Sequence, residues 1–298
     1  MLTYFQAIVM GLLQGVTELF PVSSLGHSVI IPSLIPGWNG LADKQSQPES
    51  FFLAFLVALH VGTALALIVF YRRDWDGIVR GFGRTIRDRR IEDPAGRLAW
   101  LLIVASIPAG IGGLAFEHVL RVIFAKPLYA SIFLLVNGAI LGAGERIRRR
   151  AEVKEVAVAH GTYEGTDVRR LETLEFREAA IIGVAQSLAL FAGISRSGIT
   201  MVAGLVRGLN HRDAARFSFL LATPIILAAG VYKLPDLLGP LGDGIRVQAL
   251  VGAVAASIAA YFSVAFLTRY FRTQTLTPFA VYCALAGAAM TVYFGFFR

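Results

Sequence analysis

Charged residues and cysteine are both scarce in this chain of 298 residues. Asp, Glu, Lys and Arg make up 16% of it, against about a quarter in soluble domains, whereas apolar residues reach 56%. This composition excludes a water-soluble globule, a disordered chain and a coiled coil. The single cysteine, Cys283, lies in an apolar run, which excludes an intramolecular disulfide and a cysteine-based metal site.

Long apolar runs are what the sequence has instead. A helix of about 20 residues crosses the ~30 Å hydrocarbon core of a bilayer, and six stretches qualify: 51–70, 98–116, 127–145, 214–232, 246–265 and 277–296. Two further apolar stretches, 4–35 and 178–208, are interrupted by polar residues and glycine. Polar backbone is tolerated at membrane depth only where protein or a water-filled cavity surrounds it, so both are predicted to be re-entrant helix–loop–helix hairpins.

The distribution of Lys and Arg predicts which membrane face is which. With re-entrant hairpins, 21 of the 28 basic residues fall on one side and six on the other, and Arg196 alone remains. Cytoplasmic loops collect basic residues, so we expect this side to be cytoplasmic and both chain ends to be periplasmic. Topology thus accounts for the net charge of +8, and we expect no nucleic-acid partner.

The two interrupted stretches resemble each other in sequence. At an offset of 172 residues, without gaps, four pairs align: Gly11 with Gly183, Gln14 with Gln186, Ser23 with Ser195, and Gly26 with Gly198. Each stretch precedes three spans, an odd number, so the second copy enters from the opposite face. We expect an all-α polytopic membrane protein of two inverted-topology repeats, 1–145 and 178–298, joined by a basic cytoplasmic linker at 146–177.

Away from their ends, the two interrupted stretches contain one acidic residue and one Lys or Arg. Glu18 is in the first stretch, and Arg196 occupies the equivalent place in the second. Ionisable groups at membrane depth are costly and are therefore candidates for function. The repeat would bring the two together, either as a functional site or as a buried ion pair that only joins the halves.

The neighbours of these two charges favour a site for phosphate or diphosphate. Hydroxyls, backbone N–H groups at helix starts and an arginine are the donors that phosphate oxygens need. Each serine has an alternative role as the N-cap of a broken helix. The predicted substrate-binding residues are Ser23, Ser195, Arg196, Ser197, Gly198 and Thr200.

Glu18 predicts a divalent cation, because a carboxylate does not bind phosphate directly and a metal ion is the usual mediator. Gln14 lies one helical turn earlier, so its carbonyl oxygen faces the same way. Hard oxygen ligands suit Mg²⁺ or Ca²⁺. The sequence therefore predicts a metal site at Glu18 and Gln14.

The sequence does not determine which group acts as the nucleophile. His27 is a proton carrier near neutral pH or itself a nucleophile, and Ser24 is the competing nucleophile with His27 as its base. Water activated by His27 is the third route. The candidate catalytic residues are Glu18, Ser24, His27 and Arg196. His60, inside 51–70, is interpreted as a packing residue, with a place at the cavity as the alternative.

Three motifs, 14–18 (QGVTE), 21–27 (PVSSLGH) and 193–200 (GISRSGIT), resemble the undecaprenyl-diphosphate phosphatase family of bacterial inner membranes, also called the bacitracin-resistance protein family. The resemblance covers nearly the whole chain. It implies metal-dependent hydrolysis of the lipid carrier's diphosphate to the monophosphate and inorganic phosphate, at a site facing the periplasm. It also implies recycling of this carrier for peptidoglycan synthesis, resistance to bacitracin, and roles for Glu18, Ser24, His27, Ser195, Arg196 and Thr200.

Two departures from the family pattern and two rival functions remain. Gln14 falls where the family has Glu or Gln, and Ala192 stands where it usually has Pro. Broken helices in inverted repeats also suit a transporter of a polyprenyl phosphate or another anion, although such a carrier does not need a Ser24–His27 pair. A phosphatidic-acid-type phosphatase would need a second catalytic His paired with Asp, which the hairpins lack. Gly-rich spans permit a homodimer.

Overall fold

The fold is built from helices. The computed structural model describes residues 2–38, 41, 51–124, 126–159 and 171–297, and every regular element among them is helical. Six segments within these residues are long and apolar enough to cross a membrane: Phe51–Phe70, Pro94–Phe116, Pro127–Ala151, His211–Lys233, Arg246–Tyr270 and Thr277–Phe296. They confirm the six predicted spans, so the chain is a polytopic all-helical membrane protein.

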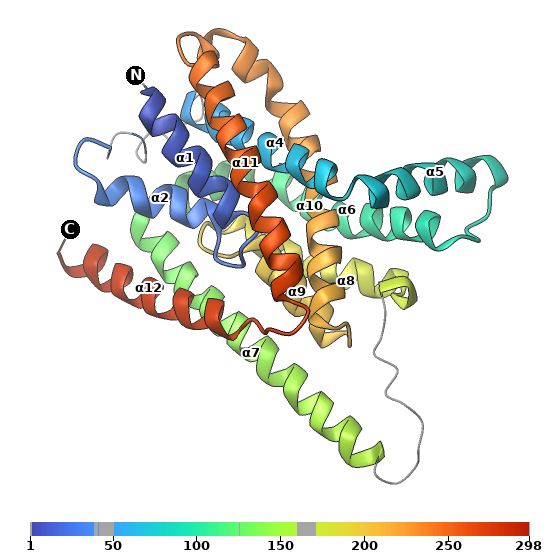
Figure 1. Cartoon of the computed structure of the whole chain (residues 1–298). Coiled ribbons are helices and arrows are strands. Elements are labelled where there is room, and N and C mark those ends of the chain that lie inside the picture. The colour runs from blue at the N-terminus through green and yellow to red at the C-terminus, as the bar shows by residue number, and fades with distance from the viewer. Residues whose placement is uncertain (1, 39–40, 42–50, 125, 160–170, 298) are drawn as a thin grey trace.

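These spans belong to the six longest apolar helices, which are α4 (Phe51–Phe70), α6 (Pro94–Phe124), α7 (Pro127–Ala159), α10 (His211–Leu238), α11 (Arg246–Tyr270) and α12 (Thr277–Phe296). In Figure 1, α7 and α12 run side by side, α1 lies along α11, and both chain ends lie on the left. The turn between α5 and α6 projects on the opposite side.

Both interrupted stretches are pairs of short helices. The first consists of α1 (Tyr4–Thr17) and α2 (Ser24–Leu34), and the second of α8 (Phe176–Gln186), a 3₁₀ turn η2 (Ser187–Leu190) and α9 (Arg196–Val206). The predicted helix–loop–helix form is therefore confirmed for both. Each first helix packs on the second long span of the other half, α1 on α11 and α8 on α6.

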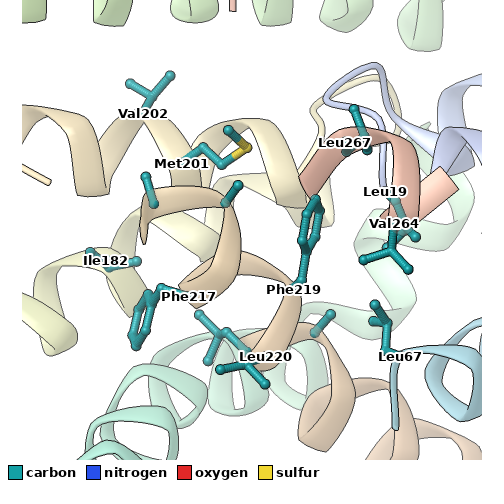
Figure 2. Close-up of a cluster of buried hydrophobic side chains, with 14 of the residues drawn as sticks. Leu19, Leu67, Ile182, Met201, Val202, Phe217, Phe219, Leu220, Val264 and Leu267 are labelled. Carbon is teal, nitrogen blue, oxygen red and sulfur yellow. The ribbon is translucent and has the colours of Figure 1, made fainter. Parts of the chain in front are cut away.

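Helix α10 contributes much of the buried core that surrounds α8 and α9. Phe217 and Phe219 are fully buried, and two residues correspond to about 200° on a helix, so their rings leave α10 on opposite sides. Figure 2 shows Phe217 beside Ile182 of α8, whereas Phe219 lies toward Leu67 of α4 and Leu267 of α11. The residue between the two rings, Ser218, is buried as well and faces α9.

Two segments outside the predicted spans are helical as well. Residues 72–88 form α5 (Arg72–Asp88), whose buried Ile78, Gly81 and Thr85 lie on one side while most of its charged residues are exposed. The first part of the expected linker 146–177 continues α7 to Ala159, because Arg, Glu and Ala favour helix and no Gly or Pro intervenes. Residues 160–170 of the linker lie outside the described residues.

Helix α6 begins four residues before the predicted span, and its start explains why. Pro94 takes the first helical position, where no N–H is needed, and Asp93 Oδ1 accepts the N–H of Gly96 at 2.7 Å. This N–H and the Arg84 guanidinium hold the pKa of the Asp93 carboxyl below its usual value.

Close backbone contact fixes each interrupted stretch to the opposite half. A Cβ added at Gly11 would lie 2.3 Å from the carbonyl oxygen of Gly252 in α11, and one at Gly183 would lie 2.4 Å from that of Ala105 in α6. Gly11 and Gly183 are the pair that the sequence offset aligned. Small residues of this kind let helix backbones approach one another in membranes.

We expect Gly183→Ala to lower the free energy of unfolding by about 1–3 kcal/mol, because the new methyl group forces α8 away from α6. The matched control is Gly110→Ala in α6, where an added Cβ meets nothing within 4 Å and alanine favours the helix. Thermal unfolding of both variants in detergent measures the difference. Equal midpoints for the two would contradict the close contact at Gly183.

Candidate active site

The two interrupted stretches meet through a buried ion pair. Glu18 directly follows α1 and Arg196 opens α9, so both sit where a helix is broken. The Arg196 guanidinium donates from Nη2 and Nε to Glu18 Oε1, at 3.1 and 3.3 Å. Glu18 is 7% exposed. The structure thus brings together the two charges that the sequence singled out.

The other carboxylate oxygen of Glu18 has a separate set of partners. Ser24 Oγ donates to Oε2 at 2.5 Å and Gln14 Nε2 donates to it at 3.1 Å. His60 Nε2 lies 3.3 Å from the same oxygen, while its Nδ1 lies 2.8 Å from the carbonyl oxygen of Leu56. The interpretation of His60 as a packing residue was therefore wrong. The signal that could have found it is an ionisable side chain in the middle of a span.

His27 is held between the first loop and the C-terminal helix. Its Nδ1 lies 2.7 Å from the carbonyl oxygen of Ser23, which can only accept, so Nδ1 carries the proton. In the neutral ring Nε2 is then the acceptor, and the Tyr282 hydroxyl of α12 donates to it at 2.7 Å. Among the described residues no hydrogen bond joins His27 to Ser24. Tyr282 was not predicted from the sequence.

Two of the predicted phosphate ligands act as helix caps. Ser23 Oγ accepts the N–H of Gly26 and Ser195 Oγ accepts the N–H of Gly198, so α2 and α9 begin in the same way. Ser23 Oγ also accepts the N–H of Gly193, at 3.1 Å. Gly193 has φ +113°, a conformation that favours glycine. The capping alternative is therefore realised for both serines, and their contact with phosphate stays a prediction.

The remaining predicted ligands lie in the same buried layer. Ser197 Oγ lies 3.0 Å from Ser195 Oγ and donates to the carbonyl oxygen of Phe20 at 3.2 Å. Thr200 Oγ1 donates to the carbonyl oxygen of Arg196 at 2.8 Å and lies 2.6 Å from Ser218 Oγ of α10. The structure thus gathers all six predicted substrate-binding residues around one junction of the two loops.

Asn137 of α7 joins the two loops and was missed by the sequence analysis. Its Nδ2 donates to the carbonyl oxygen of Pro21, and its Oδ1 accepts the N–H of Ser195, both at 3.0 Å. The side chain is fully buried. One amide thus satisfies a free backbone acceptor in the first loop and a free donor in the second, which low-dielectric surroundings require. A lone amide within an apolar span was the available signal.

The donor set suits a divalent cation that is held together with a phosphate. No group of three or more His, Cys, Asp or Glu close enough to hold a metal occurs in the described part of the chain. Mg²⁺, however, is usually bound by one or two carboxylates plus substrate phosphates, with water completing its shell. Glu18 would provide the carboxylate. Gln14 donates from Nε2 to Glu18 Oε2, so its carbonyl oxygen would serve as a second ligand only after the side-chain amide turns over.

Comparison with known proteins places this chain in a family. Residues 7–289 match the family model of the bacitracin resistance protein BacA. The chain belongs to this family. Members with similar sequences are undecaprenyl-diphosphatase 2 of Frankia alni, 53% identical over 98% of both chains, and the undecaprenyl-diphosphatase of Mycolicibacterium paratuberculosis, 55% identical over 98% of this chain and 97% of its own. The BacA resemblance of the three motifs is thereby confirmed.

We expect Asn137→Leu to lower the free energy of unfolding by about 2–4 kcal/mol, because it leaves a backbone N–H and a carbonyl unpaired in the interior, each costing about 1–3 kcal/mol. Val136→Leu, at the exposed neighbouring position, is the matched control. Unfolding in detergent with increasing denaturant measures both. A fully stable Asn137→Leu protein would show that water or another group satisfies the two loops.

Proposed function

We propose that this protein hydrolyses undecaprenyl diphosphate to undecaprenyl phosphate and inorganic phosphate. The observation that carries the proposal is the buried Glu18–Arg196 pair, surrounded by hydroxyls, in a chain 53–55% identical to undecaprenyl-diphosphatases. The reaction returns the lipid carrier to peptidoglycan synthesis, and an abundant enzyme of this kind confers resistance to bacitracin. The substrate is a lipid, which agrees with a site between membrane-spanning helices.

Binding of the terminal phosphate is the proposed role of Arg196 and the surrounding donors. A guanidinium binds phosphate through two parallel hydrogen bonds, and Nε and Nη2 of Arg196 already point together at one oxygen of Glu18. The hydroxyls of Ser23, Ser195, Ser197 and Thr200 and the Gly198 N–H, which now bind groups of the protein, would turn to the phosphate there. Glu18 and Gln14 would hold Mg²⁺ or Ca²⁺, which when bound neutralises phosphate oxygens beside the carboxylate.

Ser24 is the proposed nucleophile. Its hydroxyl donates to Glu18, so the carboxylate is positioned to accept the proton as Ser24 Oγ attacks the terminal phosphorus. The bond from this phosphorus to the bridging oxygen breaks, and undecaprenyl phosphate leaves. Water then attacks the phosphoserine, releasing inorganic phosphate and restoring the Ser24 hydroxyl. The water gives its proton to the Tyr282 hydroxyl as that hydroxyl passes its own proton to His27 Nε2, and the proton held by Glu18 returns to Ser24 Oγ as the phosphoserine bond breaks.

The proposed topology places this chemistry at the periplasmic face of the bacterial inner membrane. Two inverted repeats, with both chain ends periplasmic, would account for the 21 to six division of basic residues. The equivalent close contacts of Gly11 and Gly183, and the equivalent caps of Ser23 and Ser195, support the repeat. A homodimer, which the glycines of the spans permit, is a further proposal.

Phosphate release from a polyprenyl diphosphate, with Mg²⁺ or Ca²⁺ and purified protein in detergent, tests the function. We expect Arg196→Ala and Glu18→Ala each to lose about 10³-fold or more of the activity, because positioning and charge carry phosphoryl transfer. Arg80→Ala, on the exposed side of α5, is the control and keeps it. Folding of each variant is checked by its thermal midpoint. Arg196→Ala that keeps most of the activity would contradict the assignment.

Tyr282→Phe tests the second step separately. This substitution removes the hydrogen bond from Tyr282 to His27, which is worth about 0.5–1.5 kcal/mol. We therefore expect kcat to fall roughly three- to tenfold with little change in KM. Phosphoserine should accumulate at Ser24 in quenched reactions. Tyr293→Phe, farther along α12, should leave both values unchanged. Mass spectrometry of the quenched protein measures the phosphoserine. Unaltered kcat in Tyr282→Phe would show that the second step does not depend on Tyr282.

A further inference from the structure

A second polar cluster lies where α4 leads into α5 and where α10 begins. Arg216 of α10 pairs with Asp74 of α5, with Nε 3.1 Å from Oδ1. A cavity of about 340 Å³ adjoins this pair and is lined by Tyr71, Arg212 and Thr268 among others. A second, of about 320 Å³, adjoins it as well. Asp74 and Arg216 line both cavities, so the two cavities meet at the ion pair.

The cluster is separate from the candidate active site. Arg216 and Ser218 are two residues apart on α10, which places them on nearly opposite sides of the helix. The carbonyl oxygen of Ser218 accepts a hydrogen bond from Arg196 of the active site, whereas Arg216 faces α5. Ligand bound beside Arg216 would therefore not occupy the phosphate position proposed above.

The lining of the two cavities carries an excess of positive charge. It contains four arginines, Arg73, Arg97, Arg212 and Arg216, and two aspartates, Asp74 and Asp213. Asp74 is already paired with Arg216, and Asp213 accepts from the backbone N–H of Leu171 and from the side chain of Asn210. The two aspartates offset two of the four positive charges, so the lining keeps a net positive charge for an anion.

The second cavity also contains a buried donor that lacks an acceptor. Arg97 donates from Nη2 to the carbonyl oxygen of Leu174 at 3.0 Å, but its Nε is buried without a hydrogen-bond partner in the described part of the chain. Buried donors in proteins are nearly always satisfied, so an unpaired one indicates a missing ligand or water. Within the described residues, Arg73 and Arg212 are exposed side chains with no acidic partner.

The cavities lie at the level where three membrane-spanning segments end. Tyr71 directly follows the segment Phe51–Phe70, Arg212 lies at the start of His211–Lys233, and Thr268 lies near the end of Arg246–Tyr270. Headgroups of lipids occupy this level of a bilayer. Basic pockets between helices at such a level bind the phosphates of anionic lipids.

We propose that the two cavities form a binding site for the phosphate of an anionic lipid, on the membrane face opposite the chain ends. Its arginines hold the phosphate oxygens through charge-assisted hydrogen bonds, and Arg97 Nε gains its acceptor. The acyl chains extend along the adjoining spans. The site is independent of the proposed hydrolysis and does not include its residues. Free inorganic phosphate shares the same chemistry and is the alternative source of the anion.

Lipid binding to the full-length protein in a neutral detergent tests the proposal. The probe is dioctanoyl-phosphatidylglycerol, compared with dioctanoyl-phosphatidylcholine at the same concentration and with inorganic phosphate. Native mass spectrometry counts bound lipid, and the thermal midpoint reports stabilisation, which rises with the ratio of ligand concentration to Kd. We expect the anionic lipid alone to bind and to raise the midpoint.

Paired charge removals then locate the site. Arg73→Gln combined with Arg212→Gln should weaken binding of the anionic lipid at least fivefold, and both side chains are exposed, so the fold is retained. Arg80→Gln combined with Arg87→Gln removes the same charge from exposed positions of α5 outside the cavities and should leave binding unchanged. Equal losses in the two double variants, or equal binding of both lipids, would overturn the proposal. Displacement of the lipid by equimolar inorganic phosphate would assign the site to the free anion.

Discussion

The ion pair between Glu18 and Arg196 is the interaction on which the rest of this structure depends. Removing two charges from water costs several kcal/mol for each, and the attraction between them offsets this only when further hydrogen bonds complete both groups. Here Ser24 and Gln14 donate to the carboxylate, as does His60 when both of its ring nitrogens are protonated, and the carbonyl oxygen of Ser218 accepts from the guanidinium. Five separate helices therefore have to meet at this one point.

Breaking two helices at membrane depth creates a second requirement, which the same region meets. Helix ends leave backbone donors and acceptors free, and no water is available inside the bilayer to satisfy them. Ser23 and Ser195 cap the two new helix starts, and Asn137 joins the loops. The contacts at Gly11 and Gly183 then hold each broken segment against the opposite half. These hydrogen bonds and the close packing together hold the charged side chains of the junction in position.

Sequence analysis predicted the features that depend on composition and spacing. It missed the contacts that depend on how one helix is rotated relative to another. The six spans, the two breaks and the pairing of Glu18 with Arg196 follow from hydropathy and from the repeat. His60 and Tyr282 lie in apolar spans, and hydropathy gives no indication of which side of a span faces the site. Their partners are 42 and 255 residues away in sequence. Only the packing of α4 and α12 determines these contacts.

The two carboxylate oxygens of Glu18 have different hydrogen-bond partners, and this difference bears on substrate binding. Oε2 faces Ser24, Gln14 and His60, which belong to α2, α1 and α4, whereas Oε1 has Arg196 as its one hydrogen-bond donor among the described residues. A phosphate that draws the guanidinium away therefore frees one oxygen and leaves the other fully engaged. The carboxylate does not become an isolated buried charge during this exchange, which is the state that costs most. In the proposed reaction, a protonated His60 would thus keep Glu18 paired while Arg196 binds the phosphate.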